Sequence, residues 1–224
     1  MGGSNEIGRL KPTERQRSCR FLLGSLVALV VAFPFLETIA RPLILVMSLS
    51  AVFVAGVLVV DAGPRYVRRA FLIAAIQIAL TLISLIDREE NTSYWIAVAL
   101  ALAATAVLIL FSTYCVLSYV LRARAITRDQ LYAGISMYLM LGFAFGSVYY
   151  LISLLNPKSF AANVERPDLM YFSFVTLATL GYGDITPKSE MARSLAVIEA
   201  LAGMLYIAIF MARLVSMHSD EPYD

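Results

Sequence analysis

The chain has 224 residues, 60% of them hydrophobic, and its mean hydropathy is +0.76. This composition is typical of an integral membrane protein and excludes a soluble domain with one large core. The 18 basic and 16 acidic residues nearly balance, and we expect no nucleic-acid partner.

Apolar stretches long enough to cross a bilayer predict an all-α integral membrane fold with six transmembrane helices. They are Phe21–Ala40, Pro42–Val60, Ala70–Ile86, Ser93–Leu121, Leu131–Leu155 and Ser194–Leu214. The expected organisation is a basic tail (1–20), a four-helix module (21–121), a linker (122–130), a second domain (131–215) and a short tail (216–224). The first stretch also resembles a signal peptide with a cleavage site near Ala40, but the second stretch follows almost at once, which favours a retained helix.

Basic residues predict the orientation of the chain. If the N-terminus is cytoplasmic, twelve of the 18 lysines and arginines fall on the inner side and six on the outer side. Cytoplasmic loops carry the excess of such residues. We therefore expect a multi-pass protein of the plasma membrane, surrounded by membrane lipids, with both termini in the cytoplasm.

The fourth stretch lacks the charges of a voltage sensor. A helix that senses voltage moves several arginines through the membrane field, but no lysine or arginine occurs between Asn91 and Leu121. We therefore expect a module that responds weakly or not at all to voltage. The residues Thr127-Arg-Asp-Gln130 after it match a capping box that starts a new helix. Because this linker is short, the module is expected to pack against the second domain of its own chain.

A half-length helix is predicted over residues 168–179, with Pro167 before it and Asp168 positioned to cap its first amides. Twelve residues rise only about 18 Å, whereas the hydrocarbon core is about 30 Å thick. The helix must therefore enter the membrane and turn back. A polar loop, residues 179–184, follows it before the last apolar stretch.

The polar loop reads Thr179-Leu180-Gly181-Tyr182-Gly183-Asp184. Backbone carbonyls from four copies of such a loop can replace the hydration shell of K⁺, and glycine allows the positive φ angles that aim carbonyls inward. The loop therefore predicts a potassium selectivity filter whose ion-binding residues are Thr179, Leu180, Gly181, Tyr182 and Gly183. One filter strand per chain predicts a homotetramer with a four-fold pore.

The order of outer helix (131–155), pore helix (168–179), filter (179–184) and inner helix (194–214) resembles the pore unit of potassium channels. The whole chain resembles the compact bacterial six-span potassium channel proteins that lack a charged sensor helix. The segments that carry the resemblance are Ile126–Leu131, Asn156–Phe160, Tyr171–Pro187 and Ala192–Gly203. The resemblance implies passive K⁺ conduction without a cofactor other than the permeant ion.

The resemblance also implies individual roles. The Thr179 hydroxyl would join the K⁺ ligands, the Tyr182 ring would pack behind the filter, and Asp184 would lie at the outer mouth. Gly203 matches the hinge position of the inner helix, although a glycine there serves close helix packing equally well. We further hypothesise that the Tyr171 hydroxyl holds Asp184 and so supports the filter.

Glu199 is the ionisable residue that lies deep within an apolar stretch, so it is a candidate functional residue. It either forms hydrogen bonds behind the filter, with Ser173 or Thr176 as partners, or lines the cavity and attracts cations or protons. After it, an apolar stripe recurs at three- and four-residue spacing, which indicates either helix packing or a dewetting gate. The stripe consists of Met204, Ile207, Met211 and Val215.

The sequence also allows two other functions. Gly181-Tyr182-Gly183-Asp184 also fits the Gly-x-Gly-Asp motif of intramembrane aspartyl proteases, but that chemistry needs a second aspartate in reach. Asp61 and Asp87 lie at the ends of apolar stretches, so we expect no enzyme. The second alternative is a regulatory or structural membrane subunit that does not conduct. An unidentified regulatory subunit is also a possible partner, because the sequence names no gating stimulus.

Overall fold

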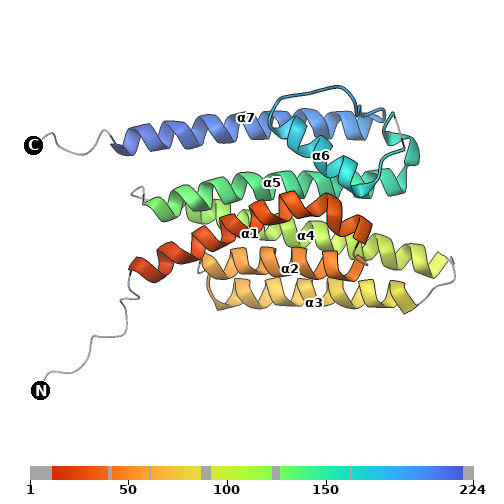
Figure 1. Ribbon diagram of the computed structural model, residues 1–224, viewed down its shortest axis with the longest axis horizontal. Helices are drawn as coiled ribbons and strands as arrows, with labels where there is room; N and C mark the ends of the chain where they lie inside the picture. Colours follow the sequence, from red (N-terminus) through yellow and green to blue (C-terminus); the bar gives the residue numbers. More distant parts are fainter. Residues whose placement is uncertain are drawn as a thin grey trace, which may run out of the picture.

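The computed structural model describes residues 12–39, 42–60, 62–86, 92–122, 127–161 and 163–218. This part of the chain forms seven α-helices, which Figure 1 labels, and one short 3-10 helix. Their bounds are α1 Pro12–Ile39, α2 Pro42–Val59, α3 Pro64–Ile86, α4 Thr92–Arg122, α5 Arg128–Leu155, η1 Pro157–Ser159, α6 Arg166–Leu177 and α7 Glu190–His218. The all-helical prediction is confirmed. The predictions that concern Asp61, Asp87 and both chain ends lie outside the described residues.

Four of these helices are long and apolar enough to cross a membrane. Within the described residues they are α3, α4, α5 and α7, while α1 and α2 contribute the shorter apolar segments Cys19–Phe33 and Val46–Val59. The chain is therefore a membrane protein with several apolar spanning helices.

Several helices begin earlier than the apolar stretches predicted. The third begins at Pro64 instead of Ala70, because its first two turns contain three arginines that an apolar window excludes. Proline suits this first position, since the amide it lacks would have no partner inside the helix. The half-length helix also begins early, at Arg166. Asp168 is therefore its third residue, and its carboxylate accepts the Glu165 amide at 2.8 Å instead of capping the helix itself.

The capping box that starts α5 is confirmed. The Thr127 hydroxyl accepts the Gln130 amide, and the Gln130 side chain accepts the Thr127 amide, each at 3.4 Å. These two bonds satisfy amides that the first turn of a helix leaves without a partner. They fix the point at which the chain leaves the linker and enters α5.

Helix α5 is the centre of the arrangement. The four-helix module packs against it through α1 and α4, and α6 and α7 pack against it as well. In Figure 1, α5 lies between α7 and the module, and α6 lies beside the N-terminal half of α7. The module thus contacts the outer helix of its own chain.

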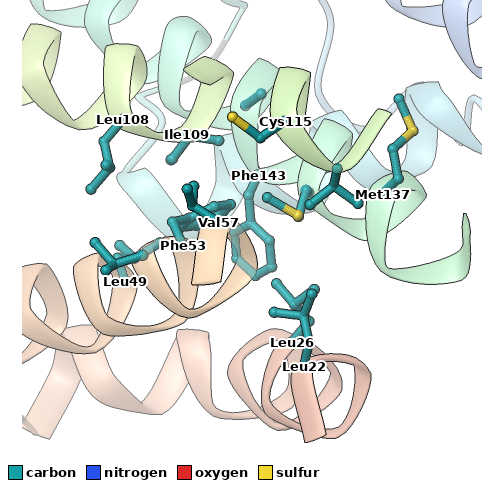
Figure 2. Close-up of a cluster of buried hydrophobic side chains, with 14 of the residues drawn as sticks. Leu22, Leu26, Leu49, Phe53, Val57, Leu108, Ile109, Cys115, Met137 and Phe143 are labelled. Atoms are coloured by element: carbon teal, nitrogen blue, oxygen red, sulfur yellow. The ribbon is translucent and has the colours of Figure 1, made fainter. Parts of the chain in front are cut away.

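A hydrophobic core joins the module to α5. Figure 2 shows side chains from α1, α2, α4 and α5 meeting there, among them Leu22, Leu26, Leu49, Phe53, Val57, Leu108, Ile109, Met137 and Phe143. The Phe143 ring lies 6.0 Å from the Phe53 ring and 5.5 Å from the Phe174 ring of α6, centroid to centroid. Phe143 therefore links the module, α5 and the half-length helix in one packed unit.

Glycines of α5 allow α6 and α7 to approach closely. A β-carbon built at Gly142 would lie 2.4 Å from the Phe174 ring, and one at Gly146 would lie 2.5 Å from the Met170 sulfur. In a membrane, where lipid is as apolar as leucine, such small-residue contacts are a main source of helix association. These glycines therefore fix the position of α6.

Candidate functional site: the loop after α6 and its supports

The loop after α6 has an alternating backbone. The φ angles of Thr179, Gly181 and Gly183 are 56°, 55° and 80°, all in the left-handed region. In an extended strand, successive residues face opposite sides. Alternating left-handed residues change that pattern and let successive carbonyls face the same side of the chain. The loop therefore has the backbone expected of a row of carbonyl ligands.

Hydrogen bonds to α6 hold the start of this loop. The amide of Thr179 donates to the Thr176 carbonyl, and the amide of Leu180 donates to the Val175 carbonyl, both at 2.9 Å. A left-handed threonine costs about 1–2 kcal/mol, and these two bonds offset that cost. Thr176 thus contributes its backbone carbonyl to the site.

Two segments, one before α6 in the chain and one after it, are hydrogen-bonded to each other at the far end of the loop. The Lys188 amide donates to the Ser159 carbonyl at 2.7 Å, and the Ala161 amide donates to the Thr186 carbonyl at 3.0 Å. We call these paired segments, residues 159–161 and 186–189, the outer strap. The outer strap closes the chain around α6 and the loop.

Asp184 lies beside the outer strap. Its side chain accepts the Ile185 amide at 3.0 Å, and the Tyr171 hydroxyl lies near enough to interact with its carboxylate. The structure therefore brings together the two side chains that the sequence paired. Phe172 points elsewhere: its ring lies 5.0 Å from the Tyr149 ring and 5.6 Å from the Phe160 ring, in a cluster against α5.

The last carbonyl of α6 has two close neighbours. The Tyr138 hydroxyl of α5 donates to the Leu177 carbonyl at 3.1 Å, and a β-carbon built at Gly203 of α7 would lie only 2.4 Å from the same oxygen. The C-terminal end of a helix carries partial negative charge and favours a nearby cation. Here that end precedes Thr179 directly. Tyr138 was not predicted, because a tyrosine within an apolar helix has the pattern of a core residue.

Glu199 is fully buried, with an exposed fraction of 0%, and joins three helices. The Tyr149 hydroxyl of α5 donates to its Oε2 at 2.7 Å, and the Ser173 hydroxyl of α6 donates to its Oε1. Ser173 is also 2.8 Å from the Gly142 carbonyl. Of the two partners suggested by the sequence, the structure brings Ser173 and not the Thr176 side chain to the carboxylate. Tyr149 is a partner that sequence reasoning missed.

Much of the surface near the loop is apolar and exposed in the single chain. Leu180 and Tyr182 of the loop are 59% and 67% exposed. The side chains of the inner-helix stripe, Met204, Ile207, Met211 and Val215, are 48–64% exposed. Gly203 is buried next to them, against α6. Neither the Tyr182 ring nor the stripe is covered by the chain's own core.

Comparison with known proteins identifies a family to which this sequence is similar. Residues 137–220 match a family model described as "Ion channel". Two-pore potassium channel 3 of Arabidopsis thaliana is 35% identical over 100 residues, which cover 44% of this chain and 21% of that one. The inward rectifier potassium channel Kirbac3.1 of Paramagnetospirillum magnetotacticum is 45% identical over 42 residues, 19% of this chain and 14% of that one.

A shorter relative is matched over most of its length. Protein LctB of Bacillus caldotenax is 30% identical over 96 residues, which cover 39% of this chain and 71% of that one. The matches to the plant and inward-rectifier channels span about a fifth of those chains or less. Each of these relatives matches only part of this chain. The family model covers α5 from Met137 onward, α6, the loop and α7. The chain belongs to the ion-channel family that includes these potassium channels.

Proposed function

We propose that four copies of this chain form a pore that conducts K⁺ passively across the membrane. The observation that carries the proposal is the alternation of positive φ angles at Thr179, Gly181 and Gly183, directly after the C-terminal end of α6. The carbonyls of Thr179, Leu180, Gly181 and Tyr182 would replace the water around the ion, together with the Thr179 hydroxyl.

The exposed loop supports a four-fold assembly. Irregular backbone at membrane depth is tolerated only where protein covers it or where it lines a water-filled cavity. In a single chain the loop residues Leu180 and Tyr182 are more than half exposed. Four loops around one axis would give the carbonyls a water-filled path on one side and give each Tyr182 ring a neighbouring chain on the other.

The finer topology belongs to the same proposal. We infer six spans, with α1 and α2 crossing beside α5; the 18 residues of α2 reach about 27 Å. Both termini would be cytoplasmic, in the plasma membrane. The channel would not be voltage-gated, because α4 carries its one basic residue, Arg122, in its last turn and no charge along its length.

The buried site of Glu199 favours the first of its two interpretations. A carboxylate with an exposed fraction of 0% that accepts hydrogen bonds from Tyr149 and Ser173 suits a support behind the filter better than a cavity lining. The exposed stripe on α7, from Met204 to Val215, would then line the inner path and close it by dewetting.

Ion flux into proteoliposomes tests the proposal. The purified protein should carry K⁺ and exclude Na⁺, and Gly181→Ala should abolish this selectivity, because Gly181 has a φ of 55° that alanine disfavours. Gly63→Ala is the matched control: Gly63 has a φ of 94° but lies in the turn before α3. Tyr182→Ala should also lose flux. An intact tetramer that carries no K⁺ under any lipid, pH or voltage would refute conduction and favour a non-conducting subunit.

A further inference from the structure

A cavity of about 270 Å³ lies at the end of the module that is remote from the filter loop. It forms where the turn before α3, the last turns of α4 and the first turn of α5 meet. In Figure 1 this is the end at which α3 and α5 begin, opposite the end that carries α6. Its polar lining consists of Tyr66, Tyr114, Ser118, Tyr119, Arg122 and Gln130.

The lining is rich in hydrogen-bond donors and carries one formal charge, the guanidinium of Arg122. Among the described residues, no acidic side chain lines the cavity. In the described part of the chain, the acidic group that is hydrogen-bonded to the lining is Asp129, which is buried and accepts the Tyr119 hydroxyl and the Cys19 thiol, each at 3.2 Å. The wall of the cavity therefore suits an anion.

The surroundings of the cavity strengthen this positive character. Two helices begin at its rim, since Tyr66 is in the first turn of α3 and Gln130 in the first turn of α5. Helix N-termini carry partial positive charge, but α2 and α4 end at the same rim, at Val59 and Arg122, and their C-termini offset it, so the positive character comes from arginines. Four exposed arginines lie on these same first turns or within one turn of them: Arg65, Arg68, Arg69 and Arg128. An arginine guanidinium in such a setting matches the geometry of a phosphate.

An apolar track leads from the cavity into the membrane-spanning part of α4. Tyr114, at the mouth, is 58% exposed, and Leu110 and Val107, one and two turns further along, are 49% and 52% exposed. Their spacing of three and four residues places all three on one face. The Tyr66 ring stacks on Phe111 with centroids 6.1 Å apart, which fixes the cavity wall beside this face. A ligand with both a charged head and a hydrocarbon chain would satisfy the cavity and the track together.

We propose that this cavity binds the phosphate headgroup of an anionic phospholipid, whose acyl chain lies along Val107, Leu110 and Tyr114. Arg122 contacts the phosphate, with Ser118 and Gln130 as further donors. The volume of 270 Å³ is below the range of about 300–1,000 Å³ that is usual for drug-sized ligands, and it suits a headgroup alone. Because the walls come from both α4 and α5, the lipid would bridge the module and the outer helix.

Binding is measured by native mass spectrometry of the full-length protein, titrated with dioctanoyl phosphatidylglycerol. Arg122→Gln should weaken binding about tenfold more than the control Arg68→Gln, because a hydrogen bond to a charged group adds to the general surface attraction. Arg68 is exposed on α3 and outside the lining, so it reports the loss of one charge alone. Ser118→Phe fills the cavity without changing the charge and should also weaken binding.

Three outcomes would overturn the proposal. Equal losses in Arg122→Gln and Arg68→Gln would reduce the effect to surface charge. Equal affinity for dioctanoyl phosphatidylcholine would remove the preference for an anionic head. Full competition by inorganic phosphate at the same concentration as the lipid would make the cavity a free-anion site. Arg122 is exposed, so Arg122→Gln should fold normally, and its unfolding temperature without lipid checks this. The readout does not depend on ion conduction, so it stands or falls apart from the proposed channel function.

Discussion

Gly203 of α7 is either a hinge or a residue that allows close packing against α6, and Gly203→Ala distinguishes the two roles. A β-carbon there would lie 2.4 Å from the Leu177 carbonyl oxygen and 2.9 Å from the Leu177 Cδ1. A carbon–oxygen contact settles near 3.3 Å, so α6 or α7 would have to move by about 0.9 Å. Such overpacking costs about 1–3 kcal/mol. The movement also strains the hydrogen bond from Tyr138 to the same oxygen, worth about 1 kcal/mol.

The two roles predict opposite signs for the change in stability caused by Gly203→Ala. Alanine is favoured over glycine inside a helix by about 1 kcal/mol, so a pure hinge glycine should give a more stable protein when replaced. A packing glycine should give a net loss of about 1–3 kcal/mol, because the overpacking and the strained bond exceed that gain. Thermal unfolding followed by circular dichroism measures the sign directly. A chain of 224 residues should lose about 2–4 °C for each kcal/mol.

Gly24→Ala is the matched control for this experiment. Gly24 lies within α1, and a β-carbon there meets nothing within 4 Å. Gly24→Ala should therefore show only the gain in helix propensity, an increase of about 1 kcal/mol in the free energy of unfolding. An increase of the same size in Gly203→Ala would refute the packing argument, and the hinge would remain as the explanation.

Three further predictions concern the supports and the path. Tyr149→Phe removes the 2.7 Å hydrogen bond to Glu199 and should destabilise the protein by about 1.5–3 kcal/mol in thermal unfolding; an unchanged unfolding temperature would show that the bond is dispensable. Tyr171→Phe removes the hydroxyl that interacts with Asp184 and should speed the loss of current during sustained opening, and unaltered decay would contradict this role. Met211→Asn puts a polar group on the exposed stripe and should raise resting K⁺ flux severalfold in liposomes; unchanged resting flux would contradict a dewetting gate.

The sequence predicted best what depends on neighbouring residues. The capping box at Thr127 and the left-handed backbone at Gly181 and Gly183 are local, and all three agree with the structure. The left-handed Thr179 was not predicted, because a β-branched residue disfavours that region. It is held there by amide bonds to α6, which become visible only when the loop folds back onto the helix.

Contacts between distant helices were harder to predict. The burial of Glu199 was inferred from its apolar surroundings, and Ser173 was named as a partner, but Tyr149 lies 50 residues away in the chain. A tyrosine within an apolar helix usually packs in a core, so its sequence gives no sign of a hydrogen bond. The starts of α1 and α3 were placed too late for a different reason. An apolar window marks the part of a helix that suits the bilayer, whereas the helix itself continues into polar residues.

The outer strap is built from main-chain groups, and this affects which sequence changes it tolerates. Its hydrogen bonds run from the amides of Ala161, Lys188 and Ser189 to the carbonyls of Thr186 and Ser159. Any amino acid except proline supplies such an amide. This end of the protein can therefore vary widely in side-chain chemistry, and acquire new surface recognition properties, while the loop that the outer strap closes keeps its shape. Proline at position 161, 188 or 189 is the substitution that this part of the chain should not accept.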